Sequence, residues 1–197
     1  MRQLIDKLIN RGEFGVINRQ VSGRFELAAV CQASQRRSAM PLLFNNVAGS
    51  KFNVVTNLYG SRQRLCEMIG ADDGLFCRRW VQLLNEKEKK HLKPGIDGPN
   101  IEFHETSLMS LPQITYQEKD AGPYITSAVF LAKDPETGVP NLSFHRAMHV
   151  DEKELRIRLG TSHHLTHYQL AAESQGQALD VAILIGPPPA YIFAAAA

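Results

Sequence analysis

Hydrophobic positions in the first part of the chain follow two different spacings. Leu4, Ile5, Leu8 and Ile9 recur at helical spacing, and Gly12 is expected to end that helix. Short apolar runs, which are typical of strands, then alternate with longer helical patterns. The expected strands are Phe14–Val21, Pro41–Val47 and Phe52–Leu58, and the expected helices are Phe25–Gln35, Ser61–Ile69 and Leu75–Leu92. This alternation predicts a layered α/β domain over roughly the first 95 residues.

The pattern changes after Lys93–Asn100, a stretch with two prolines and two glycines that is the best candidate for a linker. Beyond it, we expect strands at Ile101–His104, Tyr124–Lys133, Asn141–Val150, Glu154–Leu159 and Leu179–Ile185, and a helix at Thr161–Gln175. Asp134–Gly138 is expected to form a turn, because proline presets the first turn position and Gly138 adopts a left-handed angle at low cost. We therefore predict two domains, residues 1–104 and a β-rich domain at residues 105–197.

Composition narrows the class of protein. The 197 residues are 44% hydrophobic and 21% charged, as expected for a globular protein. The net charge of +2 and the scattered basic residues argue against a nucleic-acid partner. No apolar run approaches the roughly 20 residues that span a bilayer, so we expect no membrane span. The three cysteines fall in no redox or zinc motif, so buried, reduced thiols and a cytoplasmic location are expected.

The last residues, Ala190–Ala197, form an apolar segment that stops without a polar tail. A natural domain seldom ends in this way. We therefore expect that the chain is truncated or that its site is completed by residues of a partner.

Several histidines are candidate ligands. His163 and His167 are spaced to share one helix face, which is compatible with a metal pair, although exposed histidines at a helix start show the same spacing. His145 and His149 share a strand face through the period of two, with the same alternative. The sequence contains no zinc signature, P-loop, dinucleotide fingerprint or Gly-x-Ser-x-Gly elbow.

Asn141 and Arg146 form a more informative pair. Five residues is an odd separation, so a straight strand would point them to opposite faces; a site that uses both requires a bulge or backbone groups. An arginine here would offer a rigid fork of donors to a carboxylate or phosphate. An ordinary salt-bridged strand arginine is the alternative.

Short motifs along nearly the whole chain resemble the UbiD family of decarboxylases, in the family's order. They are Met1–Leu8, Pro41–Gly49, Val55–Ser61, Ala121–Thr126, Lys133–Gly138, Asn141–Arg146 and Val181–Ala190. The resemblance implies that the second domain is the first part of a split β-barrel like that of flavin reductases. It also implies removal of carboxylate from an aromatic or α,β-unsaturated acid, a reaction that some relatives run in reverse.

The resemblance further implies a prenylated FMN, a divalent cation (usually manganese) at its phosphate, and often a potassium ion. The implied cofactor-binding residues are Asn141, Ser143, Phe144, His145, Arg146, His163 and His164. Asn141 and His164 match the family's metal ligands, and Arg146 matches the catalytic arginine that holds the substrate carboxylate.

This sequence also departs from the family pattern. The family's catalytic glutamates, including the carboxylate that completes the metal shell, belong to a later segment, as does its oligomerisation domain. His145 occupies a position that is commonly aliphatic or aromatic. Expected partners are a flavin prenyltransferase that supplies the cofactor and either further copies of the chain or a partner subunit. The alternatives to a decarboxylase are a non-catalytic flavin-binding fragment and an assembly subunit that pairs through an exposed sheet edge.

Overall fold

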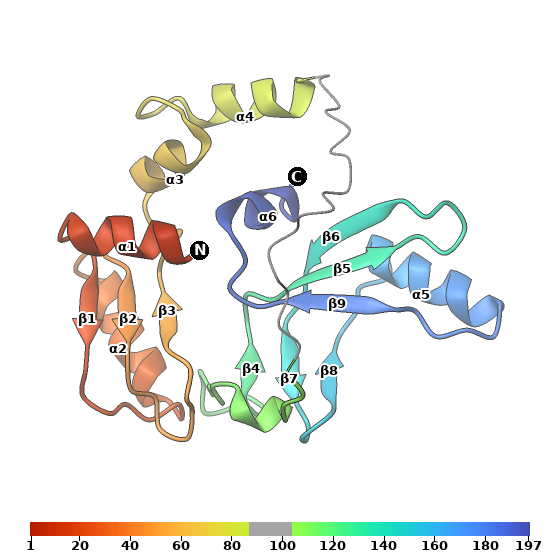
Figure 1. Cartoon of the computed structure of the whole chain (residues 1–197), viewed down its shortest axis with the longest axis horizontal. Helices are drawn as coiled ribbons and strands as arrows, with labels where there is room; N and C mark the ends of the chain where they lie inside the picture. Colours follow the sequence, from red (N-terminus) through yellow and green to blue (C-terminus); the bar gives the residue numbers. More distant parts are fainter. Residues whose placement is uncertain (87–103) are drawn as a thin grey trace.

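The computed structural model describes residues 1–86 and 104–197. The first range contains α1 (Arg2–Asn10), β1 (Gly15–Ile17), α2 (Glu26–Gln35), β2 (Leu42–Phe44), β3 (Val54–Thr56), α3 (Arg62–Ile69) and α4 (Phe76–Asn85). β1 runs parallel to β2, and β2 runs antiparallel to β3. Helices α1 and α2 flank this small sheet (Figure 1). The α/β character predicted for this region is confirmed.

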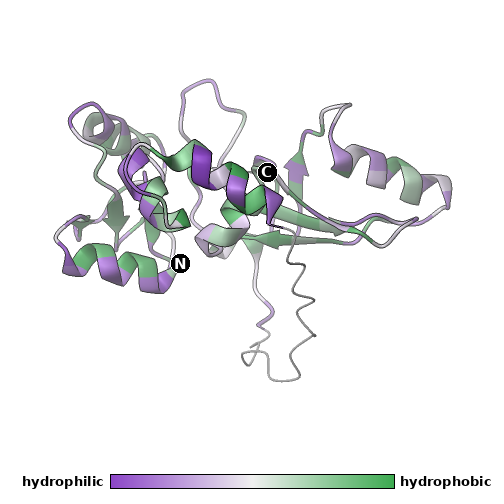
Figure 2. Cartoon of the chain, turned by 90° about the horizontal axis from the view of Figure 1, so that it is seen from above, coloured by the Kyte–Doolittle hydropathy of each residue, from purple (hydrophilic) through white to green (hydrophobic). Residues whose placement is uncertain are grey.

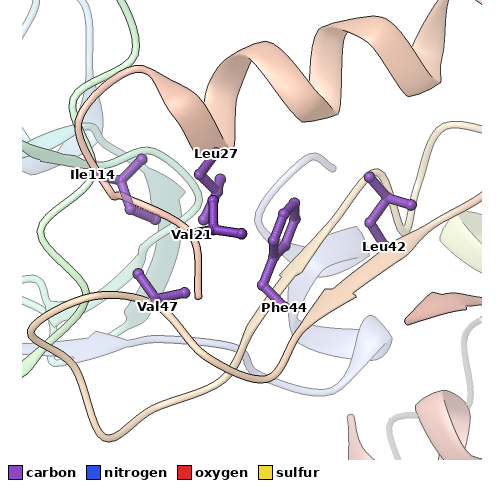
Figure 3. Packing of buried hydrophobic residues seen from close by; sticks show 6 residues of the cluster. All are labelled: Val21, Leu27, Leu42, Phe44, Val47 and Ile114. Atoms are coloured by element: carbon purple, nitrogen blue, oxygen red, sulfur yellow. The ribbon is translucent and has the colours of Figure 1, made fainter. Parts of the chain in front are cut away.

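Alternation along β2 builds a core on each face of this sheet. Leu42 and Phe44 point to one face, where Phe44 is fully buried beside Leu27 of α2 (Figure 3). Leu43 points to the opposite face and packs in the cluster that contains Leu8 of α1. The sheet is therefore covered on both sides, as its apolar strands predict.

A segment of the second range completes the first of these cores. Ile114 is buried in the cluster with Phe44 (Figure 3). The N–H of Thr115 donates to the carbonyl of Gly23 at 3.0 Å. A Cβ on Gly23 would collide with the carbonyl oxygen of Gln113, so this close approach of two main chains requires glycine. The segment therefore joins the N-terminal layers to the β-rich region.

The second range contains η1 (Leu108–Ser110), β4 (Tyr124–Ile125), β5 (Val129–Lys133), β6 (Pro140–Phe144), β7 (Ala147–His149), β8 (Leu155–Ile157), α5 (His164–Ser174), β9 (Val181–Leu184) and α6 (Pro189–Ala194). Its strands form two three-stranded sheets, in the orders β4-β7-β8 and β6-β5-β9. Both sheets are small and open, and β5 and β9 are largely hydrophobic (Figure 2). Leu165 of α5 packs against Phe130 and Ala132 of β5. The split barrel itself stays a prediction.

The two sheets are linked by a β-bulge in a long, bent hairpin. Ile125 pairs with Ala147, and Val129 pairs with Phe144. Three residues, 126–128, therefore lie opposite two, 145 and 146. This extra residue divides each of the predicted strands Tyr124–Lys133 and Asn141–Val150 into two, because a bulge bends the strand and interrupts the ladder.

The predicted turn at Asp134–Gly138 is confirmed and is held by its own side chains. The Asp134 carboxylate accepts from the N–H of Glu136 and the hydroxyl of Thr137, both at 2.9 Å. These bonds, that of Glu136 first, lower the pKa of Asp134. Gly138 adopts φ +72°, and its N–H donates to the carbonyl of Asp134 at 2.8 Å. The turn fixes the register that places Asn141 opposite Ala132.

The remaining predicted strands and helices differ from the structure in their bounds or lie partly outside the described residues. The expected strand Phe14–Val21 is ordered as a ladder only at β1, because Val21 and Val47 form an isolated bridge beyond it. Helix α4 is confirmed to Asn85. The end of the predicted helix Leu75–Leu92, the linker Lys93–Asn100 and all but the last residue of Ile101–His104 lie outside the described residues.

The cysteines only partly match the prediction. Cys66 is buried and Cys31 half-buried, but Cys77 is exposed because α4 buries none of its residues. All three thiols are free. Within the two described ranges, every helix is too short or too polar to cross a bilayer.

His149, on β7, is buried against the segment that joins the two regions. The Gln113 amide nitrogen lies 3.0 Å from the carbonyl of Leu111 and 3.2 Å from His149 Nδ1. The carbonyl fixes the amide nitrogen as a donor, so His149 Nδ1 must accept and Nε2 must carry the proton. Burial lowers the pKa of His149, which favours this neutral form.

The stability of the fold is therefore expected to fall as the pH drops below about 6.5, the usual pKa of histidine. The unfolded chain takes up a proton there before buried His149 does, so the stability contributed by neutral His149 is present above that pH and is lost below it. Urea unfolding at pH 7.5 and 5.5 measures the difference. His149→Gln should reduce the difference in the free energy of unfolding between the two pH values, while the exposed control His167→Gln should leave it unchanged. A His149→Gln variant with the full wild-type pH dependence would contradict this assignment.

Candidate cofactor and metal site

The site begins with a contact between β6 and the start of α5. Asn141 is half-buried on β6, and His164 is the first residue of α5. Asn141 Oδ1 lies 3.1 Å from His164 Nδ1. The turn at Asp134–Gly138 fixes the position of Asn141 through the strand register. The packing of Leu165 into the core beside β5 fixes the position of His164, the residue before it. Two residues far apart in the sequence thus meet at one point.

The spacing of these two atoms suits a shared cation. Two ligands about 2.1 Å from one metal ion, at a right angle, lie about 3 Å apart. An amide oxygen and an imidazole nitrogen are acceptable donors for manganese. The pair therefore fits the implied divalent cation, as one part of its shell.

His145 directly follows β6, where alternation places it on the same side as Asn141 and Ser143. Its side chain is only 6% exposed, and its Nε2 lies 2.9 Å from the hydroxyl oxygen of Ser143. The ring of Phe130 packs edge-on at 5.2 Å, and the ring of His163 lies 5.5 Å away, between centroids. Burial lowers the pKa of His145, and the charge of His163 lowers it further. His145 is therefore held neutral at neutral pH.

His163 caps the N-terminal end of α5 and is oriented by the loop before it. The N–H of Gly160 donates to His163 Nδ1 at 3.4 Å. A Cβ on Gly160 would lie 3.2 Å from the His163 ring, which is tighter than most such contacts. The hydroxyl of Thr166 donates to the Gly160 carbonyl at 2.5 Å. Gly160 and Thr166 are supporting residues that sequence reasoning missed; the only local signal was the glycine before the paired histidines.

Arg146 lies at the bulge, between the end of β6 and the start of β7. Its side chain is exposed and makes no hydrogen bond or ion pair within residues 1–86 and 104–197. The alternative interpretation, in which Arg146 is an ordinary strand arginine in a salt bridge, is therefore not supported within these residues. Because bulges redirect side chains, Arg146 need not point away from Asn141 as it would in a straight strand.

Other predicted residues stay apart from this cluster. Phe144 alternates to the opposite face from Ser143 and is 40% exposed, so the fold does not bring its ring beside His145. His167 is exposed on α5, and His149 bonds to Gln113 instead. In the described part of the chain, no three or more His, Cys, Asp or Glu side chains gather closely enough to hold a metal ion. The Asn141–His164 pair is therefore not part of such a group in this part of the chain.

The chain therefore combines an α/β unit with two open three-stranded sheets, and a polar cluster lies where β6 meets the start of α5. Residues 5–84 match the N-terminal domain of the UbiD family, described as 3-octaprenyl-4-hydroxybenzoate carboxy-lyase. Residues 94–197 match the Rift-related domain of the same carboxy-lyase. The chain belongs to the UbiD family.

Particular relatives narrow the comparison. The anhydromevalonate phosphate decarboxylase of Methanosarcina mazei is 34% identical over 193 residues, 98% of this chain and 44% of the relative. The UbiD-class enzyme HmfF of Pelotomaculum thermopropionicum, in an evolved dimeric form in complex with prFMN, is 30% identical with a TM-score of 0.79, over 96% of this chain and 44% of that one. The vanillic acid decarboxylase of Sedimentibacter hydroxybenzoicus, 24% identical, shares the fold with a TM-score of 0.82, over 97% and 43%. The chain thus spans less than half the length of these relatives.

Proposed function

We propose that this chain carries the cofactor-binding half of a UbiD-type decarboxylase. Its substrate is an aromatic or α,β-unsaturated carboxylic acid, and its cofactor is prenylated FMN with a divalent cation, manganese first. The observation that carries this proposal is the approach of Asn141 Oδ1 to His164 Nδ1 at 3.1 Å, next to the cluster of Ser143, His145 and His163. A flavin complex of the similar enzyme HmfF supports it.

Asn141 and His164 would hold the cation against the flavin phosphate. The first N–H groups of α5 lack partners within the helix and would face that phosphate as well, because helix N-termini favour anions. The cation neutralises phosphate charge and fixes the position of the cofactor. Potassium stays an expectation from the family resemblance alone.

The face of β6 would contact the flavin rings. The Ser143 hydroxyl shares a hydrogen bond with His145, whose lowered pKa favours a neutral ring, and the His145 and His163 rings supply flat surfaces for the flavin. Phe144 would contribute through its backbone, since its side chain lies on the other face. When bound, the prenylated flavin would act as an electron sink for the electron pair of the carbon–carbon bond, which stays on the substrate when carbon dioxide leaves.

Arg146 would orient the substrate. Its guanidinium offers two parallel donors to a carboxylate, and within the described residues it is not committed to another acid. The bound carboxylate would thus be fixed beside the flavin before it leaves. The protonating glutamates, and the acid that completes the metal shell, would come from residues beyond those described here.

We also propose a location, a source of the cofactor and an assembly for this protein. We place the protein in the cytoplasm, supplied with cofactor by a flavin prenyltransferase, and in an oligomer with further copies or a partner subunit. A dimeric form of HmfF is consistent with an oligomer. A non-catalytic flavin-binding chain is the second candidate, favoured by the lack of an acid cluster among the described residues.

The test is to produce the native-length polypeptide together with a flavin prenyltransferase. We expect bound flavin absorbance, and carbon dioxide release from at least one acid in a panel of aromatic and α,β-unsaturated acids. Omission of the prenyltransferase should remove the release of carbon dioxide. Flavin binding without turnover would support the second candidate, and a protein with neither property would overturn the proposal.

A further inference from the structure

A small cavity lies where α1, α3 and the start of α6 meet (Figure 1). Its charged lining residues are three cations and one acid, namely Lys7, Arg11, Arg64 and Glu67. We propose that this cavity binds a small anion that carries a phosphate group. The proposal holds whether or not the chain catalyses decarboxylation, because none of these residues belongs to the cofactor cluster on β6 and α5.

Arg64 is the most informative of these residues, because its charge is buried. The residue is only 8% exposed. Its Nε donates to the carbonyl of Leu58 at 2.8 Å, and its Nη2 donates to the carbonyl of Ala39 at 2.6 Å. These acceptors are neutral, and no described carboxylate lies within salt-bridge distance of the guanidinium. Buried charges in proteins are usually paired, so this cation favours an anion in the cavity beside it.

One nitrogen of the same guanidinium is still available for that anion. Nη1 of Arg64 donates to no acceptor in the described part of the chain. Burial lowers the pKa of Arg64, and the charges of Glu13 and Glu67 partly offset this from a longer distance. Arginine nevertheless stays protonated in proteins. Because the two carbonyls already hold the side chain in place, an anion would bind it without ordering a flexible group.

The two nearby acids are already engaged with Arg11. Its Nη1 lies 3.0 Å from a carboxylate oxygen of Glu67 and 3.8 Å from one of Glu13. These pairs are exposed, so they are weak enough for an anion to compete with them. Lys7 lies four residues before Arg11 on the same face of α1, is exposed, and makes no ion pair with any described residue. The cavity lining therefore has two more cations than acids.

The size and charge of the cavity indicate the class of ligand. Its volume is about 180 Å³. Pockets for drug-sized ligands measure roughly 300–1,000 Å³, so this cavity suits a smaller molecule. Guanidinium and ammonium groups from two helices are the donors that proteins use to bind phosphate. Inorganic phosphate and short phosphate esters share this chemistry.

Isothermal titration calorimetry of the native-length protein with inorganic phosphate, glycerol phosphate and succinate tests the proposal. We expect saturable binding of a phosphate compound that weakens as salt is added, and weaker binding of the dicarboxylate. Lys7→Gln should weaken phosphate binding at least about fivefold, because it removes a charged donor. Glu67→Gln should strengthen binding at least about threefold, because it removes the acid that competes for Arg11.

Controls locate the site and protect the test from misfolding. Arg2→Gln should leave the affinity unchanged, since Arg2 is an exposed cation of α1 that does not line the cavity. Arg64 is left unchanged because its bonds to main-chain carbonyls support the fold, and circular dichroism checks each variant. The proposal would be overturned if no phosphate compound bound saturably, or if succinate bound more tightly than all of them. Phosphate binding that responds to neither Lys7→Gln nor Glu67→Gln would also overturn it, because the anion would then lie elsewhere.

Discussion

Arg146→Ala is expected to lower turnover of the native-length enzyme about 10³-fold, with flavin binding largely unchanged. Arg146 is exposed at the bulge, has no hydrogen-bond or ion-pair partner among the described residues, and lies beside the cluster proposed to hold the flavin. Its loss removes the donors that fix the carboxylate, not the contacts that hold the cofactor. Single-turnover release of carbon dioxide and flavin absorbance measure the two effects separately.

Two further variants sharpen this result. Arg146→Lys should recover only part of the turnover, because an ammonium lacks the planar fork. Arg156→Ala removes an exposed strand arginine of β8 and should leave turnover unchanged. Unchanged turnover in Arg146→Ala would refute the proposed role of this arginine.

His164→Ala and Asn141→Ala are each expected to weaken manganese binding about 100-fold or more. Removing an outer-shell partner of a metal ligand already costs 10- to 100-fold as a rough guide, and these side chains are proposed as direct ligands. His167→Ala, three residues further along α5 and exposed, is the control. Electron paramagnetic resonance of free manganese in flavin-loaded protein gives the affinities. If all three variants bound manganese equally, the cation would have to lie elsewhere.

Local patterns in the sequence predicted most of the elements. The turn at Asp134–Gly138 is held by hydrogen bonds between its own residues, so five consecutive positions are enough to predict it. The helix expected at Ser61–Ile69 is also confirmed as α3, and the hydroxyl of Ser61 caps it by accepting from the N–H of Arg64 at 3.3 Å. Such features depend on neighbours in sequence, which the sequence itself displays.

The sequence indicated a possible bulge but not its position. The odd separation of Asn141 and Arg146 required a bulge or backbone contacts, but the extra residue lies at 126–128 on the other strand. Its position depends on pairing register, which a turn fixes on one side and the β7 ladder on the other. The sequence therefore predicted two unbroken strands where the fold has four short ones.

In the candidate site, too, the sequence indicated which residues take part but not how they lie relative to one another. The positions of Asn141 and His164 came from family resemblance, but their 3.1 Å approach depends on how α5 packs on the sheet. The contact of His145 with His163 and the roles of Gly160 and Phe130 depend on that packing too. The bond between Gln113 and His149 joins segments 36 residues apart and had no local signal.

The central claim is that Asn141 and His164 share one cation at the flavin phosphate. Anomalous diffraction at the manganese edge, from crystals of protein loaded with prenylated FMN and manganese, tests it most directly. A single peak within bonding distance of Asn141 Oδ1 and a ring nitrogen of His164, next to the phosphate, is the predicted result. A manganese peak bound by other residues, or flavin density without manganese at this pair, would contradict the claim.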